Sequence, residues 1–90
     1  MQFRVHITIS LRPSILDPAG TAVQASLHQL GHTDVNHLRI GKAIEMILPA
    51  ADPETAERLA SAMCEQLLVN PVIENYQIRV EALLPTPSPI

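Results

Sequence analysis

The sequence is short of the residue types on which many binding sites depend. Its 90 residues include one cysteine, one tyrosine, one phenylalanine and no tryptophan. A single cysteine excludes an internal disulfide and a zinc site built from several thiolates. So few aromatic rings cannot form a platform for stacked bases, and a net charge of −3 opposes binding to phosphate backbones. We therefore expect no nucleic-acid partner.

Long apolar runs are also missing. None reaches the roughly 18 residues that cross a bilayer, and the first residues alternate instead of forming the apolar block of a signal peptide. We therefore expect no membrane partner and a cytoplasmic location. The chain does have surplus apolar residues, since 47% are hydrophobic and only 17% are charged. A small domain has a thin core, so this surplus predicts an exposed apolar patch and oligomerisation.

The chain has two similar halves, and each begins a helix with Asp-Pro. Residues 2–11 alternate between apolar and polar, which predicts a half-buried strand. Asp17 and Asp52 are suited to capping helices that open at the next proline. The first helix should end at Gly31 and the second before Asn70-Pro71. The apolar face of the first helix, which should be buried, comprises Ala19, Ala22, Val23, Ser26, Leu27 and Leu30.

The segment from residue 35 to residue 49 alternates again and is interrupted at Gly41-Lys42. We interpret it as two short strands joined by a tight turn or bulge, with one bent strand as the alternative. Residues 72–81 predict a last strand. The order β-α-β-β-α-β predicts an α+β, ferredoxin-like sandwich, in which two helices cover one face of a four-stranded antiparallel sheet.

This domain should span residues 1–83, followed by a proline-rich, flexible tail at 84–90. The other face of the sheet has no predicted cover, so a partner should dock on it or on an edge strand. The residues expected there include His6, His37, Arg39, Ile47 and Arg79.

Several residues resemble parts of active sites without completing one. His28 and His32 have helical metal-ligand spacing, but Gly31 ends the helix between them. Gly41-Lys42 is only a fragment of a phosphate loop and lies between predicted strands. Cys64 falls on the buried face of the second helix and is expected to be a core residue. No carboxylate pair or serine–base pair is recognisable, so we predict no metal site and no catalytic residue.

Four stretches together resemble the PurS family, the small subunits of phosphoribosylformylglycinamidine synthase. They are LDPAGTAV at 16–23, LHQLGH at 27–32, LRIGKAIEM at 38–46 and MCEQLLVNPVIENY at 63–76. The resemblance extends from about residue 3 to residue 82. The family often has an aromatic residue where this chain has His32.

The resemblance implies a non-catalytic subunit in purine biosynthesis. It would be a homo-oligomer, a dimer or a tetramer, that joins a large synthetase subunit to a glutaminase subunit and supports ammonia transfer. ATP and Mg would be used by the synthetase, and this chain would bind no cofactor. Motif positions expected near partner contacts are Arg39, Gly41, Lys42, Asn70 and Pro71. Arg39 and Lys42 carry most of this prediction, because the other three have sufficient backbone explanations.

Two other functions stay open at this point. A dimeric regulatory domain of the ACT type, which senses small molecules, has the same order of elements. The loop RPSILDPAG lacks the glycine-rich stretch that such a domain would need. The third reading is a small dimeric enzyme with His6 or His37 as its base, but no second group is predicted to support either histidine.

Overall fold

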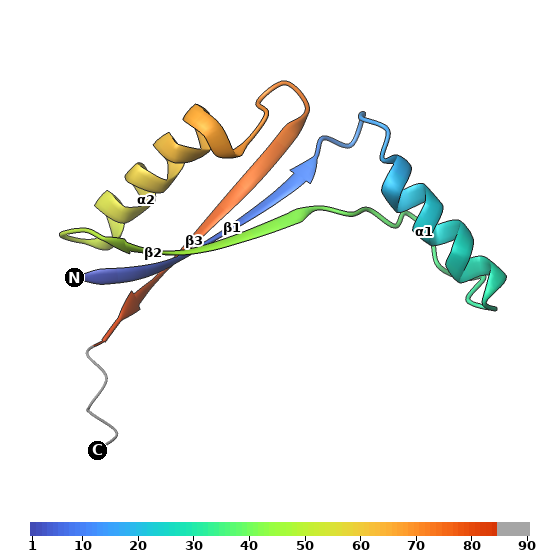
Figure 1. The fold of residues 1–90 in the computed structure, drawn as a ribbon, viewed down its shortest axis with the longest axis horizontal. Helices are drawn as coiled ribbons and strands as arrows, with labels where there is room; N and C mark the ends of the chain where they lie inside the picture. Colours follow the sequence, from blue (N-terminus) through green and yellow to red (C-terminus); the bar gives the residue numbers. More distant parts are fainter. Residues whose placement is uncertain (85–90) are drawn as a thin grey trace, which may run out of the picture.

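The computed structural model describes residues 1–84, so most of the predicted tail lies outside the described residues. The elements follow the order β1 (Gln2–Leu11), α1 (Pro18–Gln29), β2 (Lys42–Pro49), α2 (Pro53–Met63), η1 (Cys64–Leu68) and β3 (Glu74–Leu83). η1 is a π-helical turn that continues α2. Figure 1 shows α2 lying across the sheet, whereas α1 lies beyond one end of it.

The sheet is antiparallel, with β1 between β2 and β3. In its register Val5 is opposite Met46 on one side and Val80 on the other. Alternation along β1 works as predicted, because every second residue from Phe3 to Ile9 is at most 1% exposed. The antiparallel α+β class predicted from the sequence is confirmed.

The core lies between the sheet and α2. Ala56 and Ala60 are fully buried and let the helix approach the strands closely, while Cys64 at the start of η1 is also fully buried. α2 packs on β1 and β3, so it covers one side of the apolar face. On the other side, along β2, Ile44 and Met46 are only partly buried.

Both helices begin as the sequence predicts. The Asp17 carboxylate accepts a hydrogen bond of 2.8 Å from the Gly20 amide, and the Asp52 carboxylate accepts one of 2.7 Å from the Thr55 amide. Each bond satisfies an amide of the first turn that has no partner within the helix. Gly31 follows α1 with a φ of 103°, the left-handed conformation expected of a glycine at this position.

Three predicted features differ from the structure. Within residues 1–84 the sheet has three strands instead of four, because only Lys42–Pro49 of the 35–49 segment pairs with another strand. α1 does not share the face that α2 covers (Figure 1). Its predicted buried face is also largely bare, since Val23 is 41% exposed and Leu30 is 74% exposed.

The physical reason is that the predicted turn at Gly41 does not form. Lys42 pairs with Ile9 of β1, and the Ile40 amide donates to the Asp17 carboxylate at 2.8 Å. Only Gly41 lies between these two anchored residues, and a hairpin needs a loop of at least two. The chain therefore runs straight past the end of β1. As a result the radius of gyration is 17.6 Å, against about 12 Å for a compact chain of this length.

Candidate functional site

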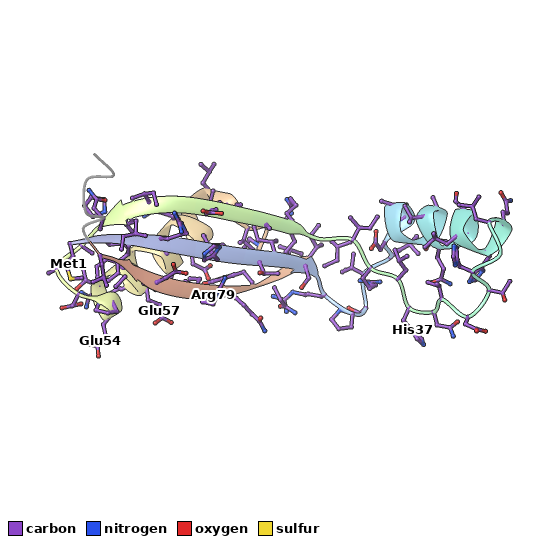
Figure 2. All side chains as sticks on the ribbon, turned by 90° about the horizontal axis from the view of Figure 1, so that it is seen from below. Met1, His37, Glu54, Glu57 and Arg79 are labelled. Carbon is purple, nitrogen blue, oxygen red and sulfur yellow. The ribbon has the colours of Figure 1, made fainter. Side chains whose placement is uncertain are left out.

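The five residues predicted to lie near partner contacts gather at one end of the sheet, where the chain leaves it toward α1. We call this region the neck. It comprises the five predicted residues and two that bind them, Arg12 and Glu74, so its members are Arg12, Arg39, Gly41, Lys42, Asn70, Pro71 and Glu74. Residues 17–40, which include Arg39 of the neck, are called the arm. Figure 2 shows the arm, with His37 labelled, at the opposite end of the molecule from Met1.

Two arginines tie the neck together through backbone carbonyl groups. Nη2 of Arg39 donates to the carbonyl oxygens of Arg12 at 3.1 Å and of Ile15 at 3.0 Å. Nη2 of Arg12 donates in turn to the Pro71 carbonyl oxygen at 2.7 Å. Guanidinium groups suit this task because their donors form a rigid fork. The arm, the β1–α1 link and the turn before β3 are thus joined by two side chains.

Lys42 and Asn70 meet at Glu74. Nζ of Lys42 lies 3.3 Å from Oε2 of Glu74, whose side chain is only 11% exposed. The Asn70 amide donates to Oε1 of Glu74 at 2.8 Å, and the Asn70 side chain accepts from the Val72 amide. The hydrogen bond from the Asn70 backbone, together with Lys42, holds the pKa of the Glu74 carboxyl below its usual range, against an opposing effect of desolvation.

Gly41 is required by a close approach and not by a turn. A Cβ atom at this position would lie 2.5 Å from the carbonyl oxygen of Ile9. Within residues 1–84 the positive φ values belong to His37, at 53°, and Gly31, and Gly41 is not one of these residues. The predicted backbone role of Gly41 therefore has a different physical cause: it lets the chain pass against the end of β1.

Asp17 joins the two ends of the arm, a role that its position as a helix cap does not reveal. Besides Gly20, its carboxylate binds the Ile40 amide, and the side chain is buried. These two hydrogen bonds, that of Ile40 first, lower the pKa of Asp17, and the charge of Arg39 adds to the effect. Gly20 is also explained, because a Cβ there would collide with the Asp17 carboxylate and with the Leu38 carbonyl oxygen.

Further contacts hold α1 against residues 35–40. The Leu38 amide donates to Oε1 of Gln24 at 2.9 Å, and Nε2 of His28 lies 2.7 Å from the Val35 carbonyl oxygen. His28 is therefore a structural residue that donates to a carbonyl group. A hollow of about 600 Å³, whose lining includes His37 and Arg39, lies between the arm and the end of β1.

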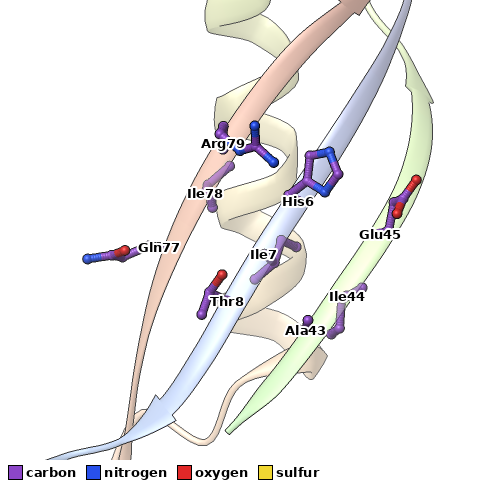
Figure 3. Close-up of a pocket in the computed structure, with 9 residues that line it drawn as sticks. All are labelled: His6, Ile7, Thr8, Ala43, Ile44, Glu45, Gln77, Ile78 and Arg79. Atoms are coloured by element: carbon purple, nitrogen blue, oxygen red, sulfur yellow. The ribbon is translucent and has the colours of Figure 1, made fainter.

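The face of the sheet opposite α2 carries a mixed set of charges. Arg4 lies 3.0 Å from Glu45 and 3.8 Å from Glu81, and His6 lies 4.0 Å from Glu81. Figure 3 shows His6, Glu45 and Arg79 around a shallow hollow of about 400 Å³ on this face.

His6, Ile47 and Arg79 thus lie where the sequence places them, but His37 and Arg39 do not. These two residues belong to the arm, because the strand predicted to carry them is not formed.

Groups that could carry out chemistry are few in the described part of the chain. Burial and the neighbouring charge of Glu65 raise the pKa of the Cys64 thiol, which makes it a poor nucleophile. Among residues 1–84 no three His, Cys, Asp or Glu side chains are grouped so that they could hold a metal ion. Over the same residues, no helix has the length and apolar character needed to cross a membrane.

Comparisons with known proteins agree on one family. The family model described as PurS, phosphoribosylformylglycinamidine (FGAM) synthase, matches residues 4–82. The PurS subunit from Synechocystis sp. is 53% identical over 81 residues, which cover 90% of this chain and 81% of that protein. The subunit from Bacillus subtilis is 40% identical over 82 residues, which cover 91% of this chain and 96% of that one.

Two solved structures extend the agreement to the fold. PurS of Methanocaldococcus jannaschii, a subunit of formylglycinamide ribonucleotide amidotransferase, has a TM-score of 0.83 at 30% identity and covers 91% of this chain and 99% of its own. A chain in the structure of PurLQS from Thermotoga maritima has a TM-score of 0.83 at 34% identity, covering 89% of this chain and 98% of its own. In both cases the match covers about nine-tenths of this chain.

Proposed function

The chain belongs to the PurS family, and from that premise we propose that it is the small subunit of a phosphoribosylformylglycinamidine synthase in purine biosynthesis. The observation that carries the proposal is the family match over residues 4–82, which contains the arm, the neck and most of the sheet. A PurLQS structure from Thermotoga maritima contains a chain of the same fold, which supports a role in assembly. A regulatory domain of the ACT type is not favoured by these matches.

In this proposal the subunit is non-catalytic and homo-oligomeric, a dimer or a tetramer, and acts in the cytoplasm. It joins a large synthetase subunit, which uses ATP and Mg, to a glutaminase subunit and supports ammonia transfer between them. The chemistry of the neck supports such a role, because Arg12, Arg39 and Glu74 are engaged with backbone groups of this chain. Side chains bound to the backbone in this way fix the shape of the neck, and in this proposal a partner subunit recognises that shape.

We place the partner contacts around the neck, at Arg39, Gly41, Lys42, Asn70 and Pro71. Lys42 supports this placement, since its side chain is 63% exposed although it is paired with Glu74. Gly41, Asn70 and Pro71 would act by fixing the path of the backbone. Arg39 would act in both ways, because it binds two carbonyl groups and also lines the hollow beside the arm.

Reconstitution with separately purified subunits tests the function. The synthetase and glutaminase subunits are mixed with formylglycinamide ribonucleotide, MgATP and glutamine, with and without this chain. We expect glutamine-dependent synthesis only when the chain is present. Ammonium salt in place of glutamine is the matched control, and synthesis from ammonia should continue without the chain because the chemistry belongs to the synthetase. Full glutamine-dependent synthesis in its absence would refute the proposal.

A further inference from the structure

The hollow of about 600 Å³ between the arm and the end of β1 differs in its charge from the hollow on the open face of the sheet. The open-face hollow is lined by Glu45 as well as by Arg79 (Figure 3). The hollow beside the arm is lined by Arg39, and among the described residues none that lines it is acidic. In a chain whose net charge is −3, a concave surface with an arginine and no carboxylate is suited to an anion.

The guanidinium group of Arg39 has donors that this chain does not use. Its Nη2 atom donates to the carbonyl oxygens of Arg12 and Ile15, but within residues 1–84 its Nε and Nη1 atoms make no hydrogen bond. The ion pairs of the same residues are made by Arg4, His6 and Lys42, and none by Arg39. The charge and the remaining donors of Arg39 are therefore available to a bound anion.

The two carboxylates nearest to Arg39 along the neck and the arm are already occupied. Oδ1 of Asp17 accepts from the Gly20 amide and Oδ2 accepts from the Ile40 amide. Glu74 accepts from the Asn70 amide and is paired with Lys42. Because both groups are bound in this way, neither needs to neutralise Arg39, and an incoming anion does not have to displace them.

Gln24 of α1 turns a donor toward the same hollow. The Leu38 amide donates to Oε1 of Gln24 at 2.9 Å, which leaves the side-chain NH2 group of Gln24 for a ligand. His37, just before Leu38, has a φ of 53°, a conformation that residues with a side chain adopt rarely. The arm therefore holds the Gln24 amide in one orientation before a ligand arrives.

Hydroxyl groups and apolar side chains complete the lining. Thr21 lies one helical turn before Gln24 on the same face of α1, and Ser10 lies near the end of β1. Neither hydroxyl makes a hydrogen bond to another residue of the described chain, residues 1–84. Leu11 and Leu38 supply apolar surface. The volume of the hollow falls within the range of about 300–1,000 Å³ that is usual for small-molecule sites.

We propose that this hollow binds the phosphate group of a small organic phosphate. The phosphate accepts hydrogen bonds from Arg39, from the Gln24 amide and from the Thr21 hydroxyl, and the organic part lies over Leu11 and Leu38. A phosphate group is favoured over a carboxylate because its additional oxygens can use donors that converge from both the arm and the neck. The site is independent of the proposed function, because every group that forms it belongs to this chain.

A titration of the full, unaltered chain followed by NMR tests the site. The probes are phenyl phosphate, inorganic phosphate, benzoate and phenol, all at one ionic strength because phosphates also gather on any basic surface. Phenyl phosphate should shift the amide signals of Thr21, Gln24 and Leu38 saturably, and it should bind more tightly than inorganic phosphate, benzoate or phenol. Benzoate or phenol binding as tightly as phenyl phosphate, or shifts spread over the whole surface, would overturn the phosphate site. Tighter binding of inorganic phosphate would overturn the part assigned to Leu11 and Leu38.

Gln24→Glu is the sharpest variant. It keeps an oxygen that accepts from the Leu38 amide and replaces the NH2 donor with a charged oxygen, so the dissociation constant for phenyl phosphate should rise about tenfold or more. Gln77→Glu is the matched control, because it makes the same change of charge on the open face and outside this hollow. Equal dissociation constants for the two variants would show that Gln24 does not contact the phosphate.

Thr21→Val provides a second test in case Gln24→Glu loosens the arm. It removes an exposed hydroxyl while keeping the shape of the side chain, and it should weaken the binding of phenyl phosphate roughly threefold. Hydrogen–deuterium exchange of residues 17–40 should stay as in the unaltered chain. Unchanged binding in Thr21→Val with the arm intact would overturn the assignment of its hydroxyl. These experiments use this chain alone, so their failure leaves the reconstitution result untouched.

Discussion

The carboxylate of Asp17 and the amide of Ile40 are joined by a hydrogen bond of 2.8 Å, although 23 positions separate them in the chain. The same carboxylate begins α1 through Gly20. One side chain thus sets both the start of the helix and the direction in which the arm leaves the sheet. Asp17 thus links a helix-capping signal that is visible in the sequence to the direction of the arm, which is visible only in the structure.

Replacing Asp17 with asparagine should loosen the arm while the sheet stays intact. The amide side chain has one acceptor oxygen in place of two, so it cannot accept from Gly20 and Ile40 through separate oxygens as the carboxylate does. Hydrogen–deuterium exchange should become faster in residues 17–40 and stay unchanged in β1 and β3. Asp52→Asn is the matched control, because Asp52 caps α2 through the Thr55 amide. Equal protection of the arm in both variants would contradict the role given to Asp17.

Gly41→Ala should destabilise the protein by about 1–3 kcal/mol, the usual cost of inserting a methyl group where there is no room. The new Cβ would press on the Ile9 carbonyl oxygen, so the pairing of β1 with the start of β2 should fray. Urea unfolding measures the loss. Gly31→Ala provides the comparison, because its φ of 103° is strained for alanine although the site is open. Only Gly41→Ala should also speed hydrogen–deuterium exchange of the Ile9 and Lys42 amides. If these two amides were as protected in Gly41→Ala as in the unaltered chain, the close-approach explanation would be wrong.

Arg39→Lys tests whether the neck must keep its shape for the subunit to function. Both bonds to the Arg12 and Ile15 carbonyl groups come from Nη2 at the end of the planar guanidinium, and the shorter, more flexible lysine side chain does not hold a donor in that position, so the free energy of unfolding should fall by about 1 kcal/mol. More of the variant should be needed for half-maximal glutamine-dependent synthesis in the reconstituted mixture. Arg79→Lys, on the open face, should change neither quantity, and an Arg39→Lys variant as stable as the unaltered chain would refute this account.

The carboxyl group of Glu74, which binds the Asn70 amide and is paired with Lys42, predicts how stability depends on pH. The pKa of Glu74 is lower in the folded state than in the unfolded chain, so its contribution is present above the ordinary glutamate pKa and is lost as the pH falls through the folded value. Urea midpoints should therefore decrease between about pH 5 and pH 3. Glu74→Gln should flatten this decrease, and Glu45→Gln, whose residue lies on the open face, should do so less. Identical slopes for the two variants would contradict the assignment.

Local structure was predictable from the sequence wherever a local rule applies. Alternation located β1 and its buried residues, and Asp-Pro located the start of both helices. The arm was not predictable in the same way. Its apolar periodicity predicts a buried face, but periodicity does not say what that face packs against. The turn expected at Gly41 failed because the anchors on both sides of it, Asp17 and Ile9, are remote in sequence.

The candidate site, too, was predictable from the sequence only in part. The motif positions Arg39, Gly41, Lys42, Asn70 and Pro71 do lie close together, although no pattern in the sequence places residues 39–42 beside residues 70–71. Arg12 and Glu74 were missed, because each acts on a backbone group that only the folded chain brings near. No spacing rule would have found them. A lone arginine just after a strand is too common to be informative.

The central position of β1 determines when this protein is able to fold. Gln2 at its start is opposite Leu83 at the end of β3, so among the three strands of residues 1–84 the first in chain order pairs with the last. Until Leu83 has left the ribosome, the apolar side of β1 lacks β3 and one of its edges is unpaired. A nascent chain therefore stays dependent on protection from aggregation until β3 has been synthesised. Deletion of β3 should accordingly remove the whole sheet and not a single strand.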